Sequence, residues 1–273
     1  MAVALTKFQR GEAMDDQGIN QQNAAALLRG AFDRVVTTQQ ENIAAAAALV
    51  VESLRADGVV QVFGTGHSRS FAMEIAGRAG GLVPANRISI PDLAFYGDLS
   101  PAEVLDPYLE RDPTLAERLL AVHDIRPADI FVICSNSGGN GSTVELARLV
   151  KERGHALVAV TSMDHTTRIT SRHPSGLRLF EVADVVIDNG GVFGDAELPL
   201  PPGADGGERG AVLATSTVTS ALIAQMLVTE VCGRLLASGA EVPILISANI
   251  PGGDAHNERL RERYGDRVKS GGP

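Results

Sequence analysis

The sequence has no tryptophan, and only 4% of its residues are aromatic. Basic residues are the minority, 24 against 33 acidic ones, which gives a net charge of -9. A nucleic-acid partner is therefore not expected, because no basic tract offsets this charge. An anionic ligand would have to be held by local dipoles and a few placed cations.

Cysteine and long hydrophobic runs are also scarce. The two cysteines, Cys134 and Cys232, have neither a pairable spacing nor a metal-site spacing, so we expect two buried small hydrophobes in a reducing compartment. The longest apolar run, IAAAAALVV (43–51), is too short to span a bilayer. The N-terminus has no charged region followed by an apolar core. These absences predict a cytoplasmic protein without a membrane partner.

What is present is a regular alternation of apolar strands and helices. Residues 1–19 have no clear period and are predicted to be a flexible extension, with 20–273 forming a single domain. An alanine-rich helical pattern fills 21–55, and we expect two helices broken near TTQQ (37–40). Continuous apolar strands are predicted at 58–64, 86–90, 129–135, 156–162 and 183–189. This order predicts an α/β fold, a doubly wound, mostly parallel five-stranded sheet with N-terminal helices.

Four further segments complete the chain. Residues 91–127 are rich in proline and acids and are interpreted as a lid-like excursion with a helix at 115–123. The Gly/Pro-rich stretch 190–210 has no regular pattern. The helix at 215–239 is apolar on nearly every face, which indicates burial, most simply between subunits. VPILIS (242–247) is expected to close as a last strand, followed by a polar C-terminal helix.

Two loops carry the strongest functional signal. Gly64–Ser68 and Ser135–Asn140 each leave a strand and enter a helix N-terminus, where unpaired N–H groups and the helix dipole favour an anion. Neither is a Walker motif or a convincing dinucleotide fingerprint. Either loop alone could be a tight turn with serine as helix cap. Two such loops in one sheet, one with Ser-x-Ser-Gly, favour phosphate binding.

With these residues the sequence resembles the sugar isomerase (SIS) family, whose Ser-x-Ser-Gly loop binds the phosphate of phosphosugars. The resemblance covers nearly the whole chain. It is most specific to a bacterial SIS subgroup, which is marked by the runs GTGHSRS, RAGGLVP, NSGGNG, SRHPSG, ADVVIDN, TSTVT and SAN…GGDAHN. It implies a flavodoxin-like SIS domain, no cofactor and a homodimer or higher homo-oligomer packed through the N-terminal helices. Actinobacterial members of the subgroup imply an N-acetylglucosamine-6-phosphate dehydratase activity.

The resemblance also implies a set of ligand-binding residues. Ser135 and Ser137 are expected to hold the phosphate, with Asn140 at a position often occupied by threonine. The full set expected to bind phosphate or sugar is Ser68, Arg69, Ser135, Asn136, Ser137, Asn140, Thr215 and Ser216. Of these, Arg69 could equally be a solvent-exposed arginine.

The reactions of this family begin with removal of the C2 proton of an open-chain aldose phosphate, which needs a general base and an acid. We predict Glu74 as the base, although it could instead pair with Arg78 at helical salt-bridge spacing. His67 and His256 are the predicted acid and oxyanion partners. A third rank of possible site residues consists of His165, Arg172 and His173. No known zinc spacing is present, and no metal is predicted.

The best interpretation is a phosphosugar lyase that dehydrates N-acetylglucosamine 6-phosphate. An aldose–ketose isomerase shares the first step and stays as an alternative. A non-catalytic phosphosugar sensor is a second alternative, disfavoured because residues 1–58 contain no helix-turn-helix or basic segment.

Overall fold

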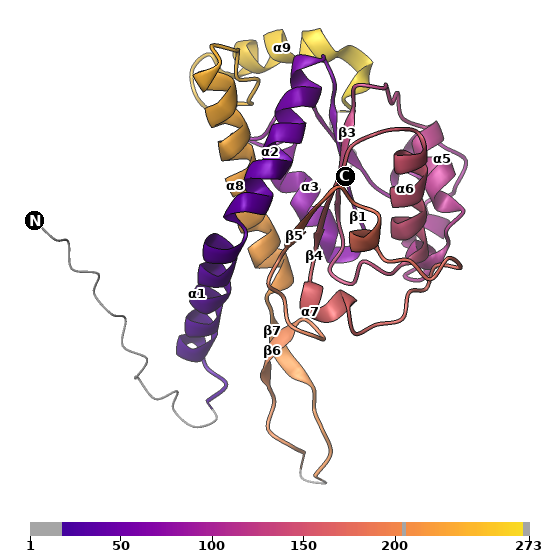
Figure 1. Cartoon of the computed structure of the whole chain (residues 1–273), viewed down its shortest axis with the longest axis vertical. Coiled ribbons are helices and arrows are strands. Elements are labelled where there is room, and N and C mark those ends of the chain that lie inside the picture. Colours follow the sequence, from indigo (N-terminus) through magenta and orange to yellow (C-terminus); the bar gives the residue numbers. More distant parts are fainter. Residues whose placement is uncertain (1–17, 204–205, 270–273) are drawn as a thin grey trace, which may run out of the picture.

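The computed structural model describes residues 18–203 and 206–269, so residues 1–17 of the predicted extension lie outside the described part. Its centre is a five-stranded parallel sheet with strand order β2-β1-β3-β4-β5, which confirms the predicted fold class (Figure 1). The strands are β1 (Val60–Gly64), β2 (Ala85–Ile88), β3 (Ile130–Cys134), β4 (Leu157–Thr161) and β5 (Val185–Asp188), with a separate hairpin of β6 (Ala196–Pro199) and β7 (Ala211–Ala214).

The helices cover both faces of this sheet. They are α1 (Gln21–Thr38), α2 (Gln40–Arg55), α3 (Arg69–Ile75), α4 (Asp92–Phe95), α5 (Leu115–Ala121), α6 (Gly141–Glu152), α7 (Met163–Thr166), α8 (Ser216–Ala237) and α9 (Gly253–Tyr264). The predicted break in the N-terminal helical pattern is confirmed at Gln39. The side chain of Gln39 accepts a hydrogen bond from the Asp188 N–H at 3.0 Å, which fixes the junction of α1 and α2 to the end of β5.

The direction of winding changes between β1 and β3. β1 pairs in parallel with β2 on one side and with β3 on the other, and Gly64 pairs with Cys134 where both strands end. From β1 the chain crosses to β2 at one edge, and the later strands continue at the other. Open α/β sheets bind ligands at such a switch point, outside the carboxyl ends of the strands. The two glycine loops therefore begin side by side.

Alternate residues of the central strands build two separate cores. Val132 and Cys134 of β3 face a core made with α2, α3 and α8. Phe131 and Ile133 of the same strand face a second core made with α5 and α6. Figure 1 shows α2 and α8 on one side of the sheet and α5 and α6 on the other. This two-sided burial explains why the strands are continuous apolar runs instead of alternating ones.

Helix α8 is only partly covered. Ile223 and Val231 are fully buried against the sheet and α2, whereas Val218 and Leu236 are exposed. Within the described residues, α8 is the one helix whose length and composition would suffice to cross a membrane, with 39% of its apolar window buried. The core helix of a globular protein passes the same test of length and composition, so the match is weak evidence for a membrane span. A partly open apolar face is also what the prediction of burial between subunits requires.

Two segments differ from the sequence prediction. Residues 242–247 form no strand but a single antiparallel bridge between Ile244 and Leu82, because Pro243 has no N–H to donate to a ladder. The stretch 190–210, predicted to lack a regular pattern, contains β6 and leads into β7. This hairpin is mostly solvent-exposed, so its side chains show little of the alternation that reveals a half-buried strand.

The C-terminal segment covers the end of the sheet where the strands begin. Leu260 and Tyr264 of α9 pack on Val59 and Val83, which precede β1 and β2. Past α9, Arg267 donates to the fully buried Asp129 carboxylate at 2.6 Å. The same carboxylate also accepts from the N–H groups of Val59 and Arg126 and from the Gln61 side chain.

Candidate functional site

The first loop passes directly over the end of β3. Gly66–Ser68 form a short 3-10 turn, η1, that leads into α3. The hydroxyls of Ser68 and Ser220, the latter from α8, both lie against the Cys134 thiol. Burial raises the pKa of Cys134 to about 11, so this thiol stays protonated at neutral pH and serves as packing. The first loop, the end of β3 and the start of α8 therefore form one contiguous surface.

The second loop is shaped to leave backbone donors free. The Ser135 hydroxyl accepts a hydrogen bond from the Gly138 N–H at 3.1 Å, and Gly138 has a φ of 60°, which favours glycine. The first backbone bond of α6 is donated by Val144 to the Asn140 carbonyl at 3.0 Å. The N–H groups before Val144 thus have no helical partner, as expected at a helix N-terminus. Ser137 is half-buried beside them.

The predicted ligand-side turn at the start of α8 lies against the second loop. The Asn189 side chain donates to the Asn136 side-chain oxygen at 3.1 Å. At Gly191, a Cβ would stand 3.1 Å from that oxygen and 3.5 Å from the Cβ of Ser216. The Ser216 hydroxyl itself donates to Asp195 at 3.0 Å. Buried Thr215, predicted with it, donates to Glu197 at 3.2 Å in the same way.

A carboxylate that the sequence analysis did not single out lies between the two loops. Glu110 belongs to a second 3-10 turn, η3 (Leu109–Arg111), within the 91–127 excursion. Its Oε1 accepts a hydrogen bond from Asn140 Nδ2 at 2.8 Å. Its Oε2 faces the first loop, where it would be 3.9 Å from a Cβ at Gly66. Glu110 is half-buried, hydrogen-bonded to the second loop and close to the first.

The backbone around Glu110 is docked on the first turn of α6. The Glu110 carbonyl accepts from the Ser142 hydroxyl at 2.7 Å. A Cβ on Gly141 would lie only 2.1 Å from the Arg111 carbonyl oxygen, so this close approach requires glycine. The excursion predicted to be lid-like is thus packed on the helix at this point.

Gly141→Ala is expected to push η3 away from α6 and to destabilise the protein by about 1–3 kcal/mol, the usual cost of overpacking. The matched control is Gly233→Ala in α8, where nothing lies within 4 Å of an added Cβ and alanine should be neutral or stabilising. Urea unfolding followed by circular dichroism measures both. Equal stability of the two variants would contradict the docking of η3 on Gly141.

Glu74, the predicted base, lies at the end of α3 and faces α8. Its Oε2 pairs with Arg78, the alternative partner considered from the sequence, and accepts from Gln225 Nε2 at 2.6 Å. Neither partner belongs to the loops. A catalytic role for Glu74 stays a prediction, tested below against Glu110.

The two predicted histidines lie at opposite ends of the sheet. His67 is exposed in η1 and directly follows Gly66, the residue of the first loop that the Glu110 carboxylate faces. His256 is in α9, where its Nε2 lies 3.1 Å from the Ile244 carbonyl oxygen. Within one chain His256 is therefore remote from both loops. Arg69, also predicted, begins α3 and lines a small hollow beside Asp92.

The third-ranked residues follow β4 and divide into two groups. His165 stacks on Phe193 with ring centroids 5.2 Å apart, and its Nδ1 accepts from the Gly194 N–H. Arg172 and His173 approach the second loop instead. Arg172 Nη1 donates to Asn140 Oδ1 at 2.8 Å, and the buried His173 pairs with Glu145 of α6 at 2.8 Å.

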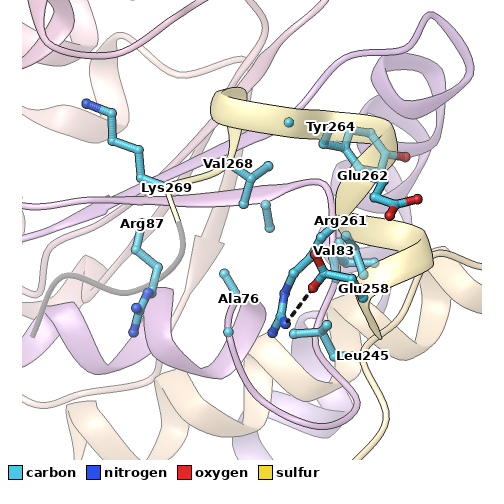
Figure 2. A pocket seen from close by; sticks show the side chains of 14 residues that line it. Ala76, Val83, Arg87, Leu245, Glu258, Arg261, Glu262, Tyr264, Val268 and Lys269 are labelled. Atoms are coloured by element: carbon cyan, nitrogen blue, oxygen red, sulfur yellow. Dashed lines mark ion pairs between the residues drawn. The ribbon is translucent and has the colours of Figure 1, made fainter. Parts of the chain in front are cut away.

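A hollow of about 340 Å³ lies elsewhere, between α9 and β2 at the amino edge of the sheet (Figure 2). Figure 2 shows the ion pair of Glu258 and Arg261, 4.0 Å apart, facing it. Its floor includes Val83 and Leu245. We place the functional site at the loops nonetheless, because parallel sheets bind ligands at their carboxyl edge. In the described residues, no three His, Cys, Asp or Glu side chains form a group that could hold a metal ion.

Comparison with known proteins identifies the family of the chain. The SIS domain model matches residues 25–162, which include both glycine loops, and the chain belongs to the SIS domain family. UPF0309 proteins are its curated relatives. One from Listeria monocytogenes is 39% identical over 231 residues, covering 85% of this chain and 91% of that protein. The one from Geobacillus kaustophilus is 38% identical over 241 residues, covering 87% and 91%.

Among solved structures, a phosphoheptose isomerase from Neisseria gonorrhoeae aligns with a TM-score of 0.49 and 17% identity, covering 77% of this chain and 95% of that one. A sequence identity of 17% with a TM-score of 0.49 does not transfer the activity of that isomerase to this chain.

Proposed function

We propose that the chain binds a phosphorylated sugar at the carboxyl edge of β1 and β3 and removes the proton from its C2 carbon. The observation that carries this proposal is the Glu110 carboxylate, which is held between the two loops beside the N-terminus of α6. The unpaired N–H groups of the second loop, with the hydroxyls of Ser135 and Ser137, would receive the phosphate. Ser68, from the first loop, would face the sugar.

The chemistry follows from the acidity of the substrate. In the open-chain form, the C1 carbonyl withdraws electrons from the C2–H bond. Glu110 would accept the C2 proton as general base, and donors in the site would stabilise the enediolate-like charge. The electron pair then forms the C2–C3 double bond while the C3–O bond breaks. The departing hydroxyl takes a proton from an acid and leaves as water. His67 is our proposed acid, because it is exposed next to Gly66.

The specific reaction that we propose is the dehydration of N-acetylglucosamine 6-phosphate. It rests on the resemblance of GTGHSRS, NSGGNG and the other runs to the bacterial SIS subgroup. The geometry by itself supports proton removal at C2, which an isomerase shares: if the proton returned at C1, the product would be a ketose.

We also propose a homodimer packed through the N-terminal helices. A groove of about 400 Å³ lies between α2 and α8, lined by Ile43, Ala44 and Met226 among others. A second copy covering this groove would bury the open apolar face of α8. Light scattering coupled to gel filtration gives the mass in solution, and a monomer at all concentrations would contradict this proposal.

The function is tested by mass spectrometry of the purified protein incubated with N-acetylglucosamine 6-phosphate, glucosamine 6-phosphate and a heptose phosphate. We expect a product lighter by one water from the first compound alone. An isobaric ketose would instead make the protein an isomerase. Tight binding without any product would leave the phosphosugar sensor as the function.

A further inference from the structure

Both polar atoms of the Asn140 side chain are hydrogen-bonded to other side chains. Its Nδ2 donates to Glu110 Oε1 at 2.8 Å, and its Oδ1 accepts from Arg172 Nη1 at 2.8 Å. A guanidinium can only donate and a carboxylate only accept, so the two partners fix which way the amide points. Asn140 is only 7% exposed, which leaves its side chain little room to turn. A phosphate oxygen would have to compete with Glu110 for the amide N–H.

Arg172 is itself held at the loop that leads into α6. Its backbone N–H donates to the Gly139 carbonyl at 2.8 Å, immediately before Asn140. The next residue, His173, is buried, and its Nε2 lies 2.8 Å from Glu145 Oε2 on α6. The other ring nitrogen accepts the Ser175 N–H at 3.1 Å. The histidine therefore carries its proton on Nε2 and donates it to Glu145, which keeps Arg172 over the start of α6.

Glu110 needs such support because the docking of its backbone on α6 does not by itself fix the orientation of its side chain. It belongs to a three-residue 3-10 turn and is only half-buried. A glutamate side chain free to rotate would lose considerable entropy each time it reached a reactive geometry. With Oε1 bound to Asn140, the second oxygen is left facing the first loop.

We propose that Arg172 and Asn140 are positioning residues that hold the Glu110 carboxylate in its reactive orientation, instead of ligands of the substrate phosphate. The inference rests on the proposed role of Glu110 as base. Arg172 acts through Asn140, with His173 and Glu145 anchoring it to α6. The phosphate is then left to the backbone N–H groups and to Ser135 and Ser137.

The test uses Arg172→Met, with Arg172→Lys as the conservative variant. A misplacement of a catalytic group by about 1 Å can cost about 100-fold, so kcat on N-acetylglucosamine 6-phosphate should fall about 10–100-fold in Arg172→Met. KM should stay within about twofold, because substrate binding is not touched. Arg172→Lys should recover part of kcat. In a Glu110→Gln background, Arg172→Met should have no further effect. The matched control is Arg168→Met, an exposed arginine of the same region that pairs with Asp164.

A second measurement does not depend on turnover. Amide hydrogen exchange of the peptide covering 105–113 should be faster in Arg172→Met and unchanged in Arg168→Met. If the wild type has no activity but exchange changes in this way, the proposed function fails while the positioning contact stands. Unchanged exchange overturns the inference. So does a rise in KM and in the Kd for inorganic phosphate with kcat preserved, which would make Arg172 a phosphate ligand.

Discussion

Glu110→Gln is expected to lower kcat by about 10²–10⁴-fold, the range that a general base contributes. Glutamine keeps the shape of the side chain and can still accept the Asn140 hydrogen bond, but it cannot take a proton. Binding of the phosphosugar should therefore persist while turnover is lost. The water-loss product, followed over time by mass spectrometry, measures the rate, and calorimetric titration measures the binding.

Glu74→Gln separates the two assignments of the base. If Glu74 only pairs with Arg78 and Gln225, as in this structure, its substitution should leave kcat within about threefold of the wild type, because neither partner belongs to the loops. The free energy of unfolding should fall by at most about 1 kcal/mol, the contribution of a half-exposed ion pair. Loss of turnover in Glu74→Gln with full activity in Glu110→Gln would restore Glu74 as base and remove Glu110. Circular dichroism of both variants shows whether each is folded.

Arg267→Met is expected to destabilise the protein by about 3–5 kcal/mol, the cost of leaving a buried charge without its partner. Arg267 lies 2.6 Å from Asp129, and their side chains are 8% and 0% exposed. Methionine keeps an unbranched apolar stem and removes the guanidinium with its charge and donors. Three other donors still reach the Asp129 carboxylate, and they cannot neutralise it. The free energy of unfolding in urea is the measurement.

Arg263→Met is the matched control, since it removes an arginine of the same C-terminal region from an exposed pair. Arg263 lies 3.2 Å from Asp57, with side chains 52% and 65% exposed. Such a pair contributes about 0–1 kcal/mol, and salt screens it. Equal losses in the two variants would show that burial does not distinguish these pairs. Both should leave the candidate site intact, because they lie at the amino edge of the sheet.

The central sheet could be predicted from the sequence because its strands are buried on both faces. Runs such as IFVIC (130–134) are apolar at every position, and helical patterns separate them. The prediction was wrong where local composition does not decide pairing. Residues 242–247 look like a strand, yet Pro243 cannot continue a ladder, and the segment forms one bridge. The hairpin of β6 and β7 was not predicted because it is mostly exposed and shows no pattern of buried positions.

Part of the candidate site could also be predicted from the sequence, and part could not. The two loops were found because their glycines and hydroxyls follow strands directly, and the structure places Asn136, Thr215 and Ser216 together. Glu110 was missed because its role depends on where the 91–127 excursion docks. Gly141 marks the docking point, because its missing Cβ admits the backbone of η3, but the sequence does not show which segment docks there.

The layered α/β architecture, the two glycine loops and the family could be read from the sequence, since each follows from short-range patterns of burial, glycine and hydroxyl groups. Which carboxylate meets those loops depends on tertiary packing. Glu74 is close to the first loop along the chain, but its helix turns it toward α8. Glu110 lies 30 residues from Asn140 in sequence, and packing on Gly141 brings its carboxylate to the loops. Such a contact depends on the fit of distant surfaces, and no local pattern encodes it.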